Sequence, residues 1–340
     1  MATRKPTSEL ARHLKAPMDE PATLLSKVLV LDGDPACHDR LKAFCEQNNL
    51  VPLKAHADNV MVVLKSNVDL GAIFLSESQG GPAGTGLALG RSIHAVRPEL
   101  PIFLRRERSS SLDDLAEDER VAFRAAFTLD DMDALRSVID RCIFTVAYPQ
   151  ALVRGIMEQT CGALENQFRD VRIEAEAPYV VRDRIIFGEL FSLMPLESNW
   201  CRGYLLLQTE EQALLDFVQA DKTYLPSDAI SFRDVNNVLG ELTNLIWGMF
   251  KNRFVSREEH SGHITQVPII VNHLHRYISF GSEDPQLCFR YTLRDESNAN
   301  ATRVVIDQRF VFNLSWAPDN FKENAAAVDA LFAAGEVEFF

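Results

Sequence analysis

The stretch Val28-Leu-Val-Leu-Asp-Gly-Asp-Pro35 decides how the first part of this 340-residue chain folds. Four successive apolar residues are typical of a strand buried on both faces, and the Asp-Gly-Asp-Pro segment after them is typical of a loop. A helical pattern follows over 37–47. Further strand-like runs lie at Val51–Ala55, Ala72–Ser76, Ile102–Arg105 and Ala125–Leu129. Five strands that alternate with helices, closed by a helical pattern over 130–147, predict a doubly wound α/β domain.

Composition restricts the class of protein. Hydrophobic residues make up 46% of the chain, enough for a core in each of two domains, and the formal net charge of −13 disfavours non-specific binding to nucleic acid or an anionic membrane. The six cysteines show no CxxC spacing, which is typical of free thiols in a cytosolic protein. Residues 1–25 are polar and contain three prolines, so we expect a flexible leader. No signal peptide or membrane-spanning run is apparent, and we expect a cytoplasmic protein.

A second domain is expected after Tyr148-Pro149. Apolar residues first recur at helical spacing from Leu152 to Leu164, and a short helix fits 210–220. Strand-like runs lie at 185–194, 203–209, 264–271, 275–280, 287–292 and 302–314. Because several of these runs follow one another without a helix between them, they predict an α+β domain with antiparallel pairing over 148–316. The alanine-rich end, 317–340, fits either a packed helix or a docking tail for a partner.

The longest helix expected covers 232–254, after cap-like residues that include Ser231. Since a helix turns about 100° per residue, its apolar residues fall within an arc of roughly 140°. They are Val235, Val238, Leu239, Leu242, Leu245, Ile246, Met249 and Phe250. On the other side, Asn237, Glu241, Asn244 and Gly248 lie within about 60° of one another. A solvated polar face is one interpretation of these four residues; a binding or catalytic surface, left bare at Gly248, is the other.

The segment Glu241-Leu-Thr-Asn244-Leu-Ile-Trp-Gly248, followed by Lys251, resembles the signature of the CheX branch of the CheC/CheX/FliY chemotaxis phosphatases. Those proteins carry Glu-x-x-Asn on an exposed helix, with a proline about 22 residues later. Here 23 residues separate Asn244 from Pro268, and Asn237 stands where the family tends to have Asp or Ser. The resemblance extends over roughly 150–315 and implies a CheC/CheX-like α+β fold.

The implied activity is hydrolysis of the aspartyl phosphate on a CheY-like response regulator. By this resemblance Asn244 holds the attacking water, Glu241 pairs with the partner's lysine, and Asn237 and Gly248 belong to the partner-binding surface. The Mg²⁺ ion comes with the partner receiver, so this chain needs no cofactor of its own. The resemblance also implies a homodimer, because CheX-like proteins pair through their sheets.

The first domain, 26–147, resembles a flavodoxin-like (βα)5 receiver that has lost its reaction. Receivers have adjacent acids after the first strand to hold Mg²⁺, whereas this chain has Asp32, Gly33 and Asp34. The phosphorylated Asp at the end of the third strand is replaced by Ser76. The Thr or Ser that ends the fourth strand is replaced by arginine in Arg105-Arg106, with Arg106 the position we assign. We therefore expect a pseudoreceiver that is not phosphorylated. Asp32 and Asp34 either cap the loop or retain a divalent cation.

Two weaker signals and two other functions remain open. The histidine pairs His260/His263 and His273/His275 fit either metal ligands or surface residues, and Gly80–Gly86 lacks the ending of a phosphate-binding P-loop. The chain could also be a non-catalytic scaffold that binds two-component signalling partners through both domains. A third possibility is a phosphatase gated by its pseudoreceiver. The sequence names neither the response regulator nor the pathway.

Overall fold

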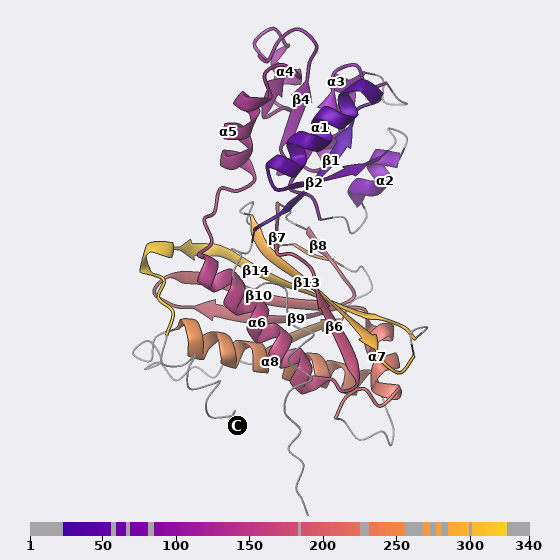
Figure 1. Ribbon diagram of the computed structural model, residues 1–340, viewed down its shortest axis with the longest axis vertical. Helices are drawn as coiled ribbons and strands as arrows, with labels where there is room; N and C mark the ends of the chain where they lie inside the picture. The colour runs from indigo at the N-terminus through magenta and orange to yellow at the C-terminus, as the bar shows by residue number, and fades with distance from the viewer. Residues whose placement is uncertain are drawn as a thin grey trace, which may run out of the picture.

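The protein is described by a computed structural model in which two sheets lie one above the other (Figure 1). The structure describes residues 23–55, 59–65, 69–80, 85–182, 185–224, 231–255, 268–272, 277–279, 285–298 and 301–324. None of the helices in these ranges is long and apolar enough to cross a membrane.

The first sheet is parallel, with the strand order β2-β1-β3-β4-β5. Its strands are β1 (Ser26–Leu31), β2 (Leu50–Lys54), β3 (Ala72–Ser76), β4 (Ile102–Arg105) and β5 (Ala125–Phe127). Its helices are α1 (Pro35–Gln47), α2 (Val60–Lys65), α3 (Gly86–Val96), α4 (Glu117–Arg120) and α5 (Met132–Cys142). This order is that of flavodoxin-like proteins, and it confirms the predicted five-stranded α/β architecture. The last helix is shorter than the expected 130–147, because the chain leaves it after Cys142 to reach the second sheet.

The second sheet is antiparallel, with the order β11-β9-β10-β14-β13-β6, and β7 also pairs with β13. Its strands are β6 (Val171–Ala175), β7 (Tyr179–Val181), β9 (Leu190–Glu197), β10 (Cys201–Thr209), β11 (Ile269–Asn272), β13 (Gln286–Asp295) and β14 (Val304–Trp316). A separate pair joins β8 (Ile185–Phe187) to β12 (Tyr277–Ser279). The helices are α6 (Gln150–Gln167), α7 (Glu211–Gln219) and α8 (Phe232–Phe254), and a short 3-10 turn, η4, covers Pro318–Asn320. The predicted antiparallel domain is present, but β6 and β7 are additional to the expected strands.

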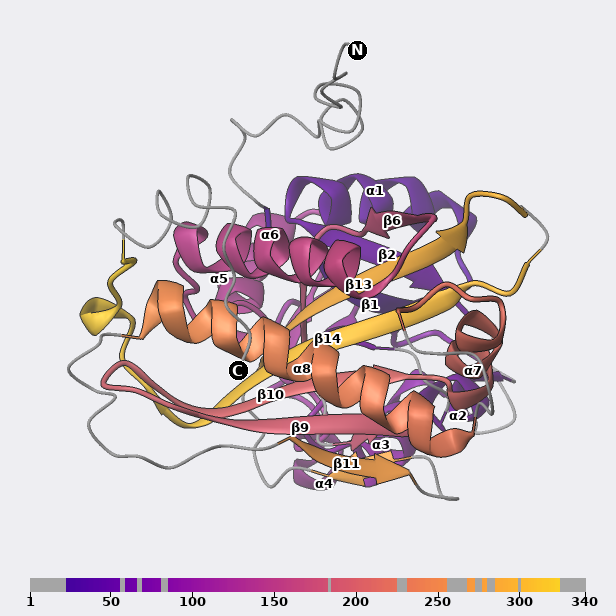
Figure 2. The ribbon, with the colours of Figure 1, turned by 90° about the horizontal axis from the view of Figure 1, so that it is seen from below.

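Helices α6 and α8 cross the same face of the antiparallel sheet, and the parallel domain lies on the other side of that sheet (Figures 1 and 2). Several predictions fall on residues that the structure does not describe. They are the leader up to residue 22, the four histidines, most of the loop 80–86, the first part of the run 264–271, the two ends of the run 275–280 and the alanine-rich segment after residue 324.

The two sheets are joined by direct contacts between the amino ends of the parallel strands and the antiparallel sheet. Leu25 forms a bridge with Tyr179, and the Ser26 hydroxyl donates to the Val180 carbonyl at 3.2 Å. The Tyr148 hydroxyl donates to the Pro285 carbonyl at 2.9 Å. One continuous cluster of buried apolar side chains runs through both parts. The carboxyl ends of the parallel strands therefore point away from the antiparallel sheet.

Candidate functional site

Helix α8 begins with a well-formed cap. The Ser231 side chain accepts a hydrogen bond from the Arg233 N–H, while the Asp234 carboxylate accepts from the Ser231 N–H at 2.7 Å. The hydrogen bond from the Ser231 backbone, with the one from its hydroxyl, lowers the pKa of Asp234 below its ordinary value. Such a reciprocal capping box satisfies amide groups that the first turn of a helix leaves free. The cap fixes where α8 starts, and so which side chains face outward.

The inner face of α8 packs on the sheet as the apolar pattern predicts. Leu245 and Met249 are half-buried, and the other predicted core residues, Val235, Val238, Leu239, Leu242, Ile246 and Phe250, are buried. Thr243 is also fully buried, which the pattern does not indicate. Its hydroxyl lies 2.7 Å from both the Ser192 hydroxyl on β9 and the Leu239 carbonyl. This polar contact fixes the rotation of α8 about its own axis.

The carboxyl half of α8 is held by side chains from its neighbours. Gln159 of α6 donates to the Met249 carbonyl at 2.9 Å, and the Trp200 indole N–H donates to the Phe254 carbonyl at 2.8 Å. Arg253 donates to Glu158 at 2.8 Å and to Glu323 at 2.6 Å. A helix fixed at both ends is a rigid platform for the residues on its outer face.

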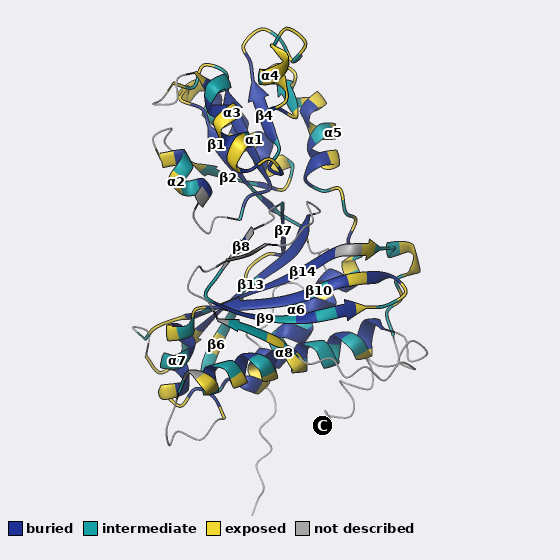
Figure 3. Ribbon diagram, turned by 180° about the vertical axis from the view of Figure 1, so that it is seen from behind, coloured by how far each residue is buried: buried dark blue, intermediate teal, exposed yellow. Residues whose placement is uncertain are grey.

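The outer face carries the residues that the sequence singles out. Asn237, Glu241 and Asn244 are exposed, and Gly248 is half-buried. A Cβ atom added at Gly248 would meet no atom within 4 Å, so the space in front of it is open. Exposed positions recur along α8 in Figure 3. A carboxylate and a carboxamide three residues apart therefore face solvent together, where both could contact another protein.

Gln167, the last residue of α6, also contributes to this surface. Its side-chain N–H donates to a Glu241 carboxylate oxygen at 3.4 Å, while Gln167 itself is largely buried. The bond orients the carboxylate without neutralising it. No sequence pattern distinguishes Gln167, since only the packing of α6 against α8 brings it near Glu241.

Pro268, the proline of the motif, lies directly before β11, the edge strand next to β9. This strand packs beside α8, and the Ile270 side chain lies 4.0 Å from where a Cβ of Gly240 would stand. Ile269 is 56% exposed, an unusual fraction for a large apolar residue of a strand. The edge of the sheet thus adds an apolar element near the polar face of α8.

The residues that the sequence predicts to be degenerate receiver positions lie at and just after the carboxyl ends of the parallel strands, apart from α8. Arg105 donates from Nε to one oxygen of Asp32, from Nη2 to the other at 3.1 Å, and from Nη2 to the Ser76 hydroxyl at 2.8 Å. Arg105, Asp32 and Ser76 are all buried. Burial works against the guanidinium charge, but the hydrogen bonds and charge of Asp32 outweigh it and raise the pKa of Arg105.

Asp34 and Arg106 have other partners. Gly33 and Asp34 are exposed, and Asp34 caps α1 by accepting from the Ala36 N–H at 2.9 Å. Hydrogen bonds from the Cys37 thiol and from that N–H lower the pKa of Asp34. Arg106 turns away from Ser76 to Glu77, at 3.2 Å, and to Asp114, at 2.7 Å. The register places Arg105, not the Arg106 assigned from the sequence, beside Ser76.

The residues of this cluster do not fit Mg²⁺. A hard divalent cation needs free oxygen ligands. Both Asp32 oxygens already accept from Arg105, and the Asp34 oxygens accept from Ala36 and Cys37. Within the described ranges, no group of three or more His, Cys, Asp or Glu residues could hold a metal ion. The cluster also lies on the opposite side of the antiparallel sheet from α8, so the two sets of residues form no common site.

No family model and no curated protein matches this chain. A chemotaxis protein CheX from Desulfovibrio desulfuricans is similar at 13% identity with a TM-score of 0.34, over 46% of this chain and 97% of that one. A CheC-like superfamily protein from Shewanella sp. PV-4 is similar at 17% sequence identity with a TM-score of 0.35. The likeness covers 48% of this chain and 99% of that one. Also similar is the receiver domain of a sensor histidine kinase from Pseudomonas aeruginosa, which has a magnesium ion in its active-site cleft. Its sequence identity is 17% and its TM-score is 0.29, over 35% of this chain and 98% of that one. Likenesses this remote assign no function to the chain.

Proposed function

We propose that the chain is a phosphatase that hydrolyses the aspartyl phosphate of a CheY-like response regulator in trans. The observation that carries this proposal is the joint exposure of Glu241 and Asn244 on one rigid helix face, beside the open space at Gly248. The Glu-x-x-Asn spacing, which resembles that of CheX-like phosphatases, supports the same activity. Ser76 cannot form an aspartyl phosphate, so the phosphate has to come from another protein.

The reaction requires little covalent chemistry from this chain, because an acyl phosphate is already activated. The water oxygen attacks phosphorus, the bond from phosphorus to the aspartyl oxygen breaks, and its electron pair stays on the partner's carboxylate. Both hydrogens of the water leave with the inorganic phosphate, as H2PO4−. Asn244 contributes by hydrogen-bonding the water and holding it in line with the bond that breaks. Positioning and electrostatics account for most catalysis in phosphoryl transfer.

Glu241 serves docking in this proposal. Its carboxylate, oriented by Gln167, pairs with the lysine of the partner's active site. The Mg²⁺ ion stays with the partner's own acidic residues, and no step needs a metal held by this chain. Exposed Ile269 and the half-buried Trp247 supply apolar contact area beside the polar stripe.

The test is the decay of a CheY-like receiver phosphorylated with acetyl phosphate and Mg²⁺, followed with and without the full chain. We expect the wild-type chain to accelerate decay and Asn244→Ala to lower the acceleration by ~10²-fold, about 2.7 kcal/mol of barrier. Asn252→Ala is the matched control, since Asn252 is an exposed asparagine of α8 outside the Glu241–Asn244 pair. Glu241→Ala should raise the receiver concentration needed for half-maximal acceleration.

Equal acceleration by wild type and Asn244→Ala would overturn the proposal. Binding of the receiver without any acceleration, unaffected by both substitutions, would instead favour the non-catalytic adaptor.

A further inference from the structure

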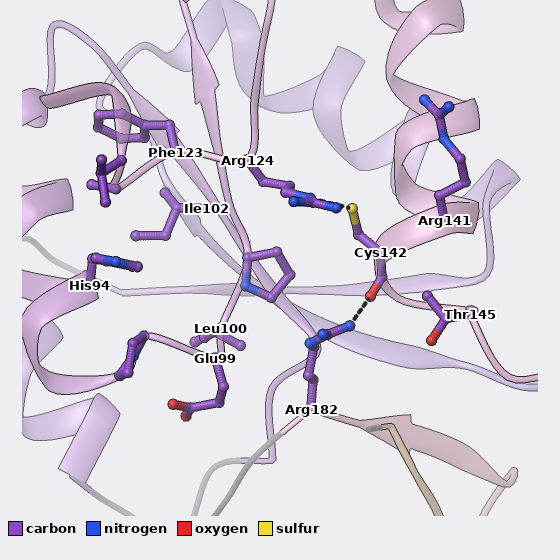
Figure 4. A pocket seen from close by; sticks show the side chains of 14 residues that line it. His94, Glu99, Leu100, Ile102, Phe123, Arg124, Arg141, Cys142, Thr145 and Arg182 are labelled. Atoms are coloured by element: carbon purple, nitrogen blue, oxygen red, sulfur yellow. Dashed lines mark hydrogen bonds between the residues drawn. The ribbon is translucent and has the colours of Figure 1, made fainter. Parts of the chain in front are cut away.

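A cavity of about 410 Å³ lies at the amino ends of β4 and β5, where the parallel domain meets the antiparallel one (Figure 4). It is lined by the end of α3, the segments that enter β4 and β5, the end of α5, and Arg182, which follows β7. Its volume falls in the range of roughly 300–1,000 Å³ that is usual for small-molecule sites, which often lie between domains. It is remote from α8 and from the Ser76 cluster.

Three arginines from different segments line this cavity: Arg124, Arg141 and Arg182. Figure 4 shows Arg124 and Arg182 approaching Cys142 from two sides. The Arg124 Nε donates to the Cys142 sulfur at 3.3 Å, and the Arg182 Nη1 donates to the Cys142 carbonyl at 2.8 Å. Among the described residues, none of the three arginines forms a salt bridge. Each guanidinium has five N–H donors, so most of them stay free for a ligand.

Among the described residues that line the cavity, no carboxylate is free to neutralise these charges. Glu99 is the acidic residue in its lining, and it accepts from the Arg97 Nε at 2.6 Å, with both side chains buried. His94 also lines the cavity. A local excess of positive charge therefore persists in a chain whose net charge is −13.

Helix termini account for only part of this arrangement. Arg141 and His94 lie in the last turns of α5 and α3, where a basic residue stabilises the negative end of the helix dipole. Arg124 precedes β5, and Arg182 comes from the second domain. Neither belongs to a helix, yet both reach the same spot. Arg141 points away from both in Figure 4, with its Nε donating to the Ser137 carbonyl of its own helix at 3.1 Å. The convergence of Arg124 and Arg182, one from each domain, is the feature that a ligand would explain.

We propose that this cavity binds a small phosphate monoester, with the phosphate on Arg124 and Arg182. Guanidinium groups bind phosphate oxygens in pairs, through planar and charge-assisted hydrogen bonds. Pro98, Pro101 and Val121 also line the cavity and are exposed or half-buried, so they form an apolar part of it that would contact the organic part of the ligand. Arg105 fills the space beside Ser76 at the opposite end of the parallel sheet, whereas the cavity between the domains is open.

The test is titration calorimetry of the full chain with inorganic phosphate, ribose 5-phosphate and AMP. We expect at least one ester to bind more tightly than inorganic phosphate, because only esters reach the apolar part of the cavity. Arg124→Gln and Arg182→Gln should each weaken that binding by about tenfold or more. Arg172→Gln is the matched control, since Arg172 is an exposed arginine on β6, away from the cavity. Arg124→Lys keeps the positive charge but loses the planar pair of guanidinium donors, so it should also weaken binding. This variant still tests the proposal if Arg124→Gln does not fold.

No heat from either ester up to about 5 mM would overturn the proposal, as would equal affinity in wild type and both glutamine variants. Equal affinity for phosphate and both esters would also contradict it, because the apolar part of the cavity would then contribute nothing. Phosphatase activity on a phosphorylated receiver is not the readout, so the two proposals fail independently.

Discussion

Asp69→Ala should strongly destabilise the protein, because it removes the partner of a buried arginine at the junction of the two domains. Asp69 precedes β3, and its carboxylate accepts from the Arg309 Nη2 of β14 at 2.7 Å and from the Tyr179 hydroxyl at 3.0 Å. The two charged side chains are only 10% and 4% exposed. Without Asp69, Arg309 keeps a weak acceptor, the Cys288 sulfur at 3.5 Å. Asp307 is near but already accepts from Arg290 at 2.6 Å.

Breaking a buried ion pair by removing one partner costs about 3–5 kcal/mol. In chains of 150–250 residues, a loss of 1 kcal/mol lowers Tm by about 2–4 °C, so this loss corresponds to a decrease of roughly 6–20 °C. Because this chain is longer, we expect a decrease near the lower of these two values. The assay is urea unfolding of wild type, Asp69→Ala, Arg309→Met and the double variant. If the pair is coupled, the double variant should be less destabilised than the sum of the single variants by more than about 1 kcal/mol. A single-variant loss below about 1 kcal/mol, or additive losses, would refute this account of the interface.

The same pair predicts how stability depends on pH. Burial alone would raise the pKa of Asp69, but the charge of Arg309 and the hydrogen bonds from Arg309 and Tyr179 outweigh it and lower the pKa. A carboxyl whose pKa is depressed in the folded state contributes stability above its unfolded-state pKa and loses it as pH falls through the folded-state value. Wild type should therefore lose this contribution in acid, below about pH 4. Asp69→Ala, which lacks the contribution at every pH, should show a flatter decline there.

Three further changes test other parts of the structure. Arg105→Ala leaves a buried carboxylate unpaired and should cost about 3–5 kcal/mol in urea unfolding, whereas Arg108→Ala, at an exposed arginine nearby, should cost less than about 0.5 kcal/mol. Ser231→Ala removes the cap of α8 and should cost about 1 kcal/mol in the same assay. Burial raises the pKa of the Cys45 and Cys288 thiols to about 12, so a disulfide reagent at pH 8 should label them only as fast as the protein unfolds; rapid labelling would contradict the buried positions.

The parts of the fold that could be predicted are those with strong local patterns. The bounds of β3, β4 and α8 match the sequence-based expectation, because apolar runs and a long apolar stripe define them without help from distant residues. β6 was missed because Val171-Arg-Ile-Glu-Ala175 is a short edge strand with two charged residues, which reads as a loop. Local pattern therefore predicts core elements better than edges.

Single residues of a site depend on register and on long-range contacts. The sequence assigns Arg106 to the end of the fourth strand, one residue away from the correct residue, Arg105. Successive side chains of a strand point to opposite faces, so this error of one residue matters. Arg105 contacts Ser76, whereas Arg106 contacts Asp114. Gln167 and Thr243 were missed for a different reason. Their roles come from contacts with Glu241 and Ser192, more than fifty residues away along the chain, and no periodicity marks such pairs.

The position of the domains also changes how gating of the proposed phosphatase by the parallel domain can be tested. Because the parallel domain and α8 lie on opposite sides of the antiparallel sheet, the parallel domain does not cover Glu241 or Asn244, and any influence on them has to pass through the sheet. Comparing residues 148–340 with the full chain would confuse gating with folding, since the truncation removes Asp69 and leaves Arg309 without its carboxylate. Arg309→Met within the truncated chain removes the buried charge that has lost its partner. The phosphatase activity of this truncated variant should be compared with that of the full chain carrying Arg309→Met. A difference between the two activities would indicate gating.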